Sequence, residues 1–199
     1  PLVNVKGHIN FEQVNFTYPD REPLLKNFNL EISAGETIAL IGQNGSGKTT
    51  LAHLLMRFIQ PDSGRISFDG KDISQYNLES IRHTVGLVAQ HTLLINGSVA
   101  QNIGYGRYNA SKDDIEKAAR SAHAHDFIMH MPQGYDTNIG AQGVRISGGQ
   151  RQRISLARTL LTDPPILVFD EATSMYDPKG EKDFIKECYD LLKERTVIL

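Results

Sequence analysis

The segment at residues 42–49 reads Gly-Gln-Asn-Gly-Ser-Gly-Lys-Thr, and it constrains the fold more than any other feature of the chain. It matches the pattern Gly-x-x-x-x-Gly-Lys-Ser/Thr. An apolar run at residues 36–41 precedes it and is typical of a buried strand, whereas residues 48–58 follow as a helix with apolar residues on one face. A glycine-rich turn between a strand and a helix predicts an α/β fold with a phosphate-binding loop.

The residue types in this loop explain how it could hold phosphate. Gly42, Gly45 and Gly47 let successive N–H groups turn toward phosphate oxygens, and the N-terminus of the following helix adds a partial positive charge. The pattern assigns the β- and γ-phosphates to Lys48 and a Mg²⁺ ion to Thr49. The neighbours that complete the predicted nucleotide site are Asn44, Ser46 and Thr50.

A second apolar run, residues 166–169, ends in the carboxylates Asp170 and Glu171. The carboxyl ends of parallel strands are where ligands bind in open α/β sheets. We expect Asp170 in the Mg²⁺ shell, directly or through water, and Glu171 next to a water that attacks the γ-phosphate. Two solvated acids at the start of a loop are the alternative, which the phosphate loop disfavours.

The rest of the chain is organised by its periodicity and its turn residues. Alternating apolar residues and an Asp-Gly turn favour strands in the first ninety residues, and the stretch from residue 98 to about 161 is mainly helical. The predicted strands are 9–16, 28–32, a hairpin at 66–73, 84–89, 166–169 and 196–199, and the predicted helices are 112–125, 149–161 and 180–193. The βαβ spacing at the end implies a parallel pair of strands.

Composition excludes several classes of protein. The 199 residues carry 21 Lys+Arg against 23 Asp+Glu, so the net charge of −2 argues against a basic nucleic-acid-binding domain. The single cysteine, Cys188, cannot form an internal disulfide, and we expect a reducing, intracellular compartment. The longest apolar runs are strand-sized, so the chain is not expected to cross a bilayer itself.

Residues 147–150, Ser-Gly-Gly-Gln, place a serine and two glycines at the start of a helix. This is a second possible phosphate cradle, made of Ser147, Gly148, Gly149 and Gln150. A chain with one phosphate loop cannot easily wrap both cradles around one nucleotide. The economical arrangement is therefore two chains that face each other head to tail.

With these motifs in this order, the chain resembles the nucleotide-binding domain of an ABC transporter of the exporter type over nearly its whole length. The resemblance implies one ABC ATPase domain over residues 1–199. Its expected architecture is an α/β P-loop NTPase core with a mostly parallel sheet, an N-terminal antiparallel β-subdomain and an inserted helical subdomain at about residues 91–161. In this family a switch histidine follows the strand at 196–199, so we expect a C-terminally truncated domain.

The resemblance also implies a role for individual residues. It identifies residues 42–49 as the Walker A loop, 166–170 as Walker B and 147–150 as the signature. Glu171, Gln90 and Lys48 are the implied catalytic residues, and Tyr18 matches the aromatic residue that stacks on adenine. Gln90 also contacts Mg²⁺ with Thr49 and Asp170, and Asp177 matches the aspartate of the D-loop.

The implied function is an ATP-hydrolysing motor that uses ATP and Mg²⁺. It would dimerise with a second nucleotide-binding domain around two ATP molecules. A fused or associated transmembrane domain would then move substrate across the membrane, with this chain at the cytoplasmic face of the inner membrane. Nucleic acid is not an expected partner.

The exporter assignment depends on Tyr18 and on residues 131–140, which resemble the stretch before a loop that touches the membrane domain. The chain departs from the exporter pattern at four positions, which affects coupling and dimer fit more than nucleotide binding. These positions are Ala141, Ile146, Met175 and Tyr176.

The same motifs are compatible with other functions. A soluble ABC-type ATPase acting on nucleic acid or ribosomes, a stand-alone importer subunit and a regulator without turnover share the same motifs, although Glu171 argues against the last. His123, His125 and His130 could suggest a metal cluster, but we expect them on a solvated helix because a metal site needs more converging ligands.

Overall fold

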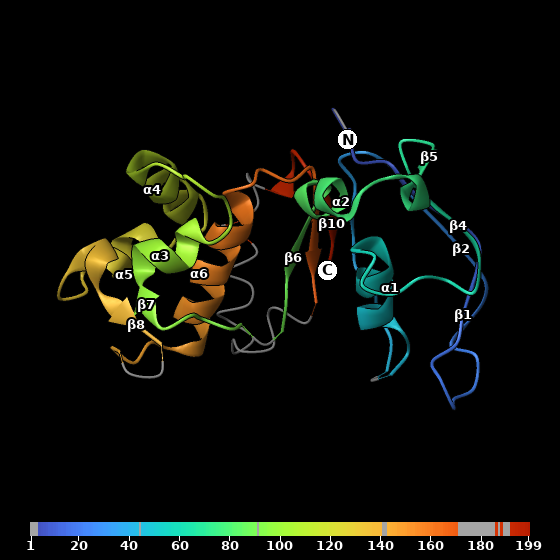
Figure 1. Cartoon of the computed structure of the whole chain (residues 1–199), viewed down its shortest axis with the longest axis horizontal. Helices are drawn as coiled ribbons and strands as arrows, with labels where there is room; N and C mark the ends of the chain where they lie inside the picture. Colours follow the sequence, from blue (N-terminus) through green and yellow to red (C-terminus); the bar gives the residue numbers. More distant parts are fainter. Residues whose placement is uncertain are drawn as a thin grey trace. The chain divides into compact units, whose positions relative to one another are not determined.

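The computed structural model describes residues 4–43, 45–90, 92–140, 143–170 and 192–199, together with Lys186 and Cys188. The chain separates into two compact units (Figure 1). The first unit contains residues 1–87, 164–170 and 192–199, and the second contains 88–163 and 171–191.

An antiparallel sheet forms the beginning of the first unit. Its strands, in the order β2-β1-β4-β5, are β1 (Ile9–Phe16), β2 (Leu25–Ile32), β4 (Ser63–Phe68) and β5 (Lys71–Asp72). The apolar positions predicted for the first strand, Ile9, Phe11, Val14 and Phe16, are all buried. The two predicted N-terminal strands and the hairpin are therefore confirmed.

A bulge in β1 explains why its buried residues do not alternate strictly. The register with β2 shifts between Phe11 and Val14, and Gln13 has a positive φ of 49°. The Gln13 N–H donates to Asn29 Oδ1 at 2.9 Å, so the displaced peptide keeps a partner. The extra residue returns Val14 to the core face of the sheet.

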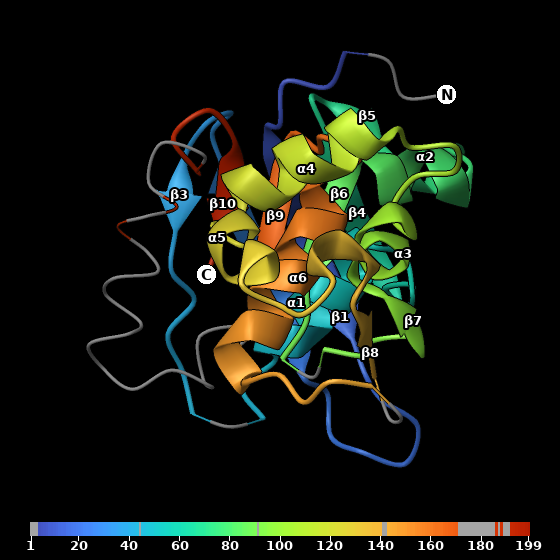
Figure 2. The same ribbon diagram turned by 90° about the vertical axis from the view of Figure 1, so that its left-hand side faces the viewer.

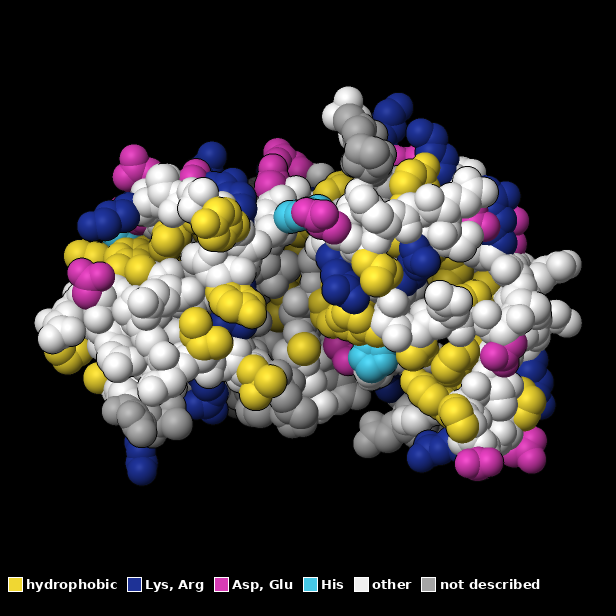
Figure 3. All heavy atoms as spheres, viewed as in Figure 1, with side chains coloured by type: hydrophobic (Ala, Val, Ile, Leu, Met, Phe, Trp, Pro, Cys, Tyr) yellow, Lys and Arg dark blue, Asp and Glu magenta, His cyan; other side chains and the backbone are white. Residues whose placement is uncertain are grey.

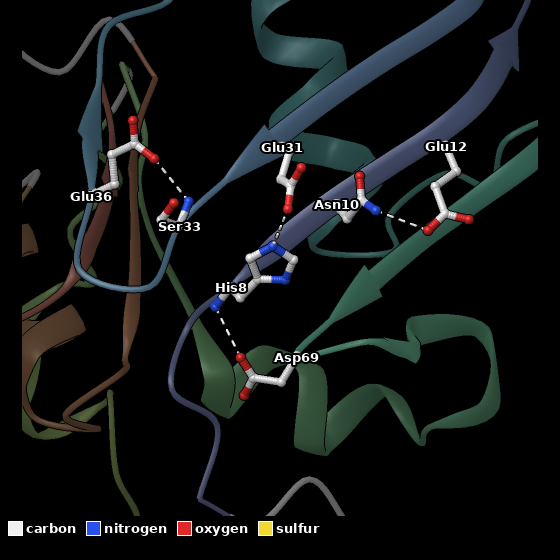
Figure 4. Close-up of polar contacts among 7 residues, drawn as sticks. All are labelled: His8, Asn10, Glu12, Glu31, Ser33, Glu36 and Asp69. Carbon is white, nitrogen blue, oxygen red and sulfur yellow. Dashed lines mark hydrogen bonds and ion pairs between the residues drawn. The ribbon is translucent and has the colours of Figure 1, made fainter.

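Polar contacts fasten the start of β1 to the β4–β5 hairpin and to β2 (Figure 4). The Asp69 carboxylate accepts the His8 main-chain N–H at 2.9 Å, and the His8 ring pairs with Glu31 at 2.9 Å. Asp69 and Gly70 both have positive φ, as the two central residues of a tight hairpin turn require. A turn after β2 is closed by the Ser33 N–H, which donates to Glu36 Oε2 at 2.8 Å.

A second sheet has the order β3-β10-β9-β6, and all of its residues except Val88 belong to the first unit. Its strands are β3 (Thr37–Ile38), β10 (Thr196–Ile198), β9 (Ile166–Phe169) and β6 (Val85–Val88). β10 runs parallel to both β9 and β3, which confirms the predicted parallel pair, and Figure 2 shows β9 beside β10. Every residue of β9 is buried, as expected for a central parallel strand.

The strand predicted at residues 36–41 is shorter and more exposed than expected. β3 contains only Thr37 and Ile38, and Ile41 is 96% exposed. β3 pairs with β10 on one side, and no further strand pairs with its outer side among the residues that the structure describes. An edge position leaves its side chains less covered than those of β9.

Helix α1 (Lys48–Leu55) buries Leu51, Leu54 and Leu55 in the core of the first unit, as predicted. The predicted helix at 48–58 ends at Leu55, and Phe58, the last apolar residue of the predicted helix, is 50% exposed. The helix ends before Pro61 because Arg57 takes a positive φ of 50°, and its guanidinium donates to the carbonyls of Ile73 and Tyr76. These carbonyls belong to η1 (Ile73–Gln75) and to the turn before α2 (Leu78–Thr84).

The second unit is mainly helical. Its helices are α3 (Val99–Gly104), α4 (Lys112–Ser121), α5 (His125–Met129), η2 (Gly134–Asp136) and α6 (Gly148–Leu160). Two short strands that are distant in the sequence, β7 (Gly97–Ser98) and β8 (Asn138–Ile139), form an antiparallel pair. Figure 1 shows α3 and α4 beside α6, which packs against both. Reciprocal capping boxes at Ser98, Ser111 and Ser147 define where α3, α4 and α6 begin.

The predicted helix at 112–125 is divided into two. α4 ends at Ser121, His123 takes a positive φ of 52°, and α5 begins at His125. Ala122 and Ala124 on either side of the break are fully buried, so the turn itself packs into the unit. The predicted helix at 180–193 falls mainly outside the described part of the chain. None of the helices in that described part is long and apolar enough to span a membrane.

Candidate nucleotide site

The loop at residues 42–49 leads directly into α1, and its geometry fits an anion at the start of the helix. Gly47 is the N-cap residue of α1 with a φ of 103°, a conformation that side chains rarely adopt. A glycine cap has no side chain to accept a hydrogen bond from the first N–H groups of the helix. Those donors and the helix dipole are therefore directed at the loop.

Lys48 places its charge inside the same loop. Its Nζ donates to the carbonyl of Gly42 at 2.9 Å and to the carbonyl of Gln43 at 3.2 Å. The side chain therefore folds back over the loop from the first turn of α1. A phosphate oxygen in this loop would offer the ammonium group a stronger, charged acceptor than these carbonyls.

Thr49 and Asp170 meet although they are far apart in the sequence. The Thr49 hydroxyl, in the first turn of α1, donates to Asp170 Oδ1 at 2.8 Å, and Asp170 immediately follows β9. The two residues predicted as Mg²⁺ ligands thus lie together in the first unit. Their oxygens are ligands of the kind that Mg²⁺ prefers, with its remaining positions filled by phosphate and water.

Tyr18 lies beside the same helix. Its hydroxyl hydrogen-bonds the hydroxyl of Thr50 at 3.1 Å, and its ring packs edge-on against Phe16 with the centroids 4.8 Å apart. The Tyr18 side chain is half-buried. These contacts place the predicted adenine-stacking ring next to α1, while its role toward adenine stays a prediction.

The residues predicted as the signature form the first turn of α6 in the second unit. The Ser147 Oγ accepts the Gln150 N–H at 3.1 Å, and Gln150 Oε1 accepts the Ser147 N–H at 2.9 Å. Gly148 and Gly149 lie between them and begin the helix. Gln90 belongs to the same unit and follows β6 by two residues, half-buried.

Several residues predicted from the sequence lie outside the part of the chain that the structure describes. They are Asn44, Ala141, Glu171, Met175, Tyr176 and Asp177.

The three histidines of the second unit do not converge. His125 Nδ1 hydrogen-bonds the Tyr135 hydroxyl at 3.0 Å, whereas His130 Nδ1 bonds the Asp126 carbonyl at 2.6 Å. Burial, followed by the charge of Glu116, raises the pKa of Tyr135 to about 12. His125 is therefore packed rather than solvated. No group of three or more His, Cys, Asp or Glu side chains that could hold a metal occurs within the part of the chain described.

Sequence reasoning missed Gln152, a residue with close contacts on both sides of Gln90. It stands between two arginines in a polar run, which is typical of a solvated helix, yet it is 1% exposed. Gln152, Leu156 and Leu160 are spaced by four residues and are all buried. This helical spacing is the signal that could have placed Gln152 on the inner face of α6.

The fold and the glycine-rich loop before α1 together define the class of protein. A parallel sheet, a glycine-rich loop opening α1, and a strand-end aspartate bonded to the threonine of that loop are the features of a P-loop nucleotide-binding protein.

Comparison with known proteins gives the family. A family model described as ABC transporter matches residues 25–174, so the chain belongs to the ABC transporter family and is an ATP-binding, ATPase-type domain with the expected P-loop architecture. An ATP-dependent lipid A-core flippase of Pectobacterium atrosepticum is 50% identical over all of this chain and 34% of its own length. A proposed multidrug export ATP-binding/permease protein of Staphylococcus aureus is 46% identical, and the match covers 100% of this chain and 35% of that protein.

A solved structure agrees with these relatives. A bacterial Atm1-family ABC exporter with ATP bound has a TM-score of 0.90 and 41% identity, and the match covers 100% of this chain and 34% of that one. The chain therefore spans about a third of the length of the proteins that it matches.

Proposed function

We propose that this chain is the ATP-hydrolysing motor domain of an ABC exporter. The observation that carries the proposal is the Thr49–Asp170 hydrogen bond beside the Lys48 loop, which brings the two predicted Mg²⁺ ligands to the phosphate-binding end of α1. The relatives described as a flippase, an export permease and an exporter support the export function.

The first unit binds the nucleotide. The N–H groups at the start of α1 and the Lys48 ammonium hold the β- and γ-phosphates, and Tyr18 stacks on the adenine. Thr49 and Asp170 hold a Mg²⁺ ion, which neutralises charge on the phosphates when it is bound. The loop residues that complete the phosphate site are Gly42, Asn44, Gly45, Ser46, Gly47 and Thr50.

Hydrolysis needs a base and a residue that orients water. Glu171 follows Asp170 directly in the sequence, and its carboxylate accepts the proton of the attacking water. Gln90 supplies an amide that orients this water and contributes to the Mg²⁺ shell.

The ATP site is completed by a second nucleotide-binding domain. In this arrangement the γ-phosphate held by one domain contacts Ser147, Gly148, Gly149 and Gln150 of the other. These residues form the N-terminus of α6, and a helix N-terminus favours an anion through its N–H groups and its dipole. ATP binding thus joins two domains head to tail, and hydrolysis separates them.

The second unit docks a fused or associated transmembrane domain at the cytoplasmic face of the inner membrane. Hydrophobic side chains lie on its surface, which Figure 3 shows in yellow among polar groups, and Leu93, Tyr105 and Tyr108 are strongly exposed. A surface pocket of about 300 Å³ beside the signature is lined by Leu94, Gly140, Val144, Arg145, Ile146 and Arg151. Exposed apolar residues of this kind mark interaction sites.

The test compares Lys48→Ala with Lys71→Ala in the purified protein. Lys71 is an exposed lysine of β5 in the same unit, so its substitution removes the same charge outside the site. We expect Lys48→Ala to lower the rate of phosphate release from ATP by roughly a hundredfold or more, because it removes charge stabilisation of the transferring group. An equal rate in the two variants would refute the assignment of the loop.

A further inference from the structure

Gln152 is a buried amide with two partners that lie on either side of Gln90. Its Oε1 accepts the Thr92 hydroxyl at 2.9 Å, and its Nε2 faces the Ala89 carbonyl at a longer 3.4 Å. The side chain is 1% exposed, so these polar atoms depend on protein partners rather than on water. One side chain therefore holds the chain just before and just after Gln90.

Gln152 is also part of the helix that begins with the signature. Ser147 caps α6 and Gln150 closes its capping box, so Gln152 lies in the second turn of the same helix. Hydrogen bonds along a helix keep its turns in fixed relation to each other. A shift of the signature end of α6 is therefore transmitted to Ala89 and Thr92.

Arg158 fastens the same segment further along α6. Its guanidinium donates to the Leu93 carbonyl at 3.0 Å and to the carbonyl of Asn102 at 2.8 Å. Asn102 is fully buried. Its Oδ1 accepts the Ile95 N–H, and its Nδ2 donates to the Ile95 carbonyl. The chain from Ala89 to Asn102 is thus attached to α6 at two places, about 9 Å apart along the helix axis at 1.5 Å per residue.

We infer that Gln152 is a positioning residue for Gln90, and that it couples the orientation of the signature helix to the placement of the Gln90 amide. The inference rests on the proposed function, in which Gln90 acts on the ATP-bound site. When a second domain engages the signature, α6 and the Gln90 segment move as one body. Gln152 thereby makes the hydrolytic position of Gln90 depend on the contact between the two domains.

The experiment measures steady-state ATP hydrolysis and, separately, ATP binding without Mg²⁺. Gln152→Met keeps the volume and removes both hydrogen bonds, and Thr92→Val removes the donor from the half-buried partner. We expect each to lower kcat roughly tenfold, as small displacements of catalytic groups do. The Kd for ATP without Mg²⁺ should stay within about twofold, since the phosphate loop belongs to the other unit.

Thr162→Val is the matched control for Thr92→Val. The Thr162 hydroxyl donates to the Thr159 carbonyl at the end of α6, so its loss removes a local bond and leaves the Gln90 segment attached. We expect wild-type kcat in this variant. A tenfold loss there, equal to that of Thr92→Val, would overturn the inference because any lost hydroxyl near α6 would then have the same effect.

A double-mutant cycle separates positioning from a merely structural role. If Gln152 acts through Gln90, then Gln152→Met lowers kcat no further in a Gln90→Ala background. Independent, multiplied losses in the double variant would overturn the inference, as would wild-type kcat in both Gln152→Met and Thr92→Val. A wild-type protein without ATPase activity would instead refute the proposed function itself.

Discussion

At the scale of single residues, the proposed nucleotide site combines backbone donors with a few side chains to which we assign distinct tasks. In the proposed site, Lys48 would supply a mobile charge, Thr49 and Asp170 hard oxygen atoms, and Tyr18 an aromatic face. Because the tasks differ, substitutions at these positions should alter different measured quantities.

Tyr18→Ala should weaken ATP binding by about 1–3 kcal/mol, the usual contribution of a base stacked on an aromatic ring. Tyr18→Phe is the matched control, since it keeps the ring and loses only the hydroxyl bond to Thr50. Isothermal titration calorimetry measures both. Equal losses in the two variants would show that the hydroxyl, not stacking, makes the contribution.

Thr49→Val should raise the Mg²⁺ concentration needed for half-maximal hydrolysis, because the variant keeps the shape and loses the hydroxyl. Thr49→Ser retains an oxygen at the same place and should need the wild-type Mg²⁺ concentration. A Mg²⁺ titration of ATPase rate distinguishes them. The ligand assignment fails if the valine variant titrates as the wild type does.

At the scale of elements, the second unit depends on how its helices begin and how closely they approach. In α4 the Ser111 side chain and main chain, followed by Arg107, hydrogen-bond Asp114 and hold the pKa of that carboxyl below its ordinary value of 3.8. A lowered pKa in the folded state means that ionised Asp114 favours folding.

The contribution of Asp114 is present at neutral pH and is lost as pH falls through its folded pKa, below 3.8. Asp114→Asn should therefore lower Tm at pH 7, and the difference from wild type should shrink as the pH is lowered toward 3. Asp113→Asn is the control, because that carboxylate lies in the same first turn outside the capping box. Thermal unfolding at several pH values measures the Tm difference between Asp114→Asn and wild type. A Tm difference that does not change with pH would contradict the role assigned to the Asp114 carboxylate.

Gly106 is needed because another chain segment passes close to it. A Cβ at this position would lie 2.1 Å from the Arg158 carbonyl oxygen, which is main chain and cannot rotate away. Gly106→Ala should destabilise the protein by about 1–3 kcal/mol, as overpacking does. At Gly104 an added Cβ would approach only the end of the Ile115 side chain, at 3.3 Å, so Gly104→Ala should be close to neutral. Equal losses of Tm in Gly106→Ala and Gly104→Ala would contradict the assigned role of Gly106.

Much of the architecture follows from local patterns, and the exceptions have tertiary causes. The alternation of apolar residues predicted β1, and an apolar run predicted β9. Apolar residues at helical spacing, preceded by glycines, predicted where α1 and α6 begin. The burial of Gln152, the exposure of Phe58 and the turn at His123 depend on neighbours that are distant in sequence. The pairing of Thr49 with Asp170 was predictable because both belong to motifs with a known shared ligand.

At the scale of the whole molecule, the proposed transport cycle requires two nucleotide-binding domains and a membrane domain. The phosphate loop and the signature belong to different compact units of one chain. In the proposed cycle ATP is held between the loop of one domain and the signature of another, so binding and dimer formation are linked events. Domain association should then depend on ATP concentration.

The most direct measurement compares Glu171→Gln with the wild type for both ATP binding and ATP hydrolysis. The amide keeps the shape of the side chain but cannot accept the proton of the attacking water. We predict ATP affinity within about twofold of wild type and a rate of phosphate release lower by roughly 10²–10⁴-fold, the usual contribution of a general base. Wild-type hydrolysis by Glu171→Gln would contradict the account.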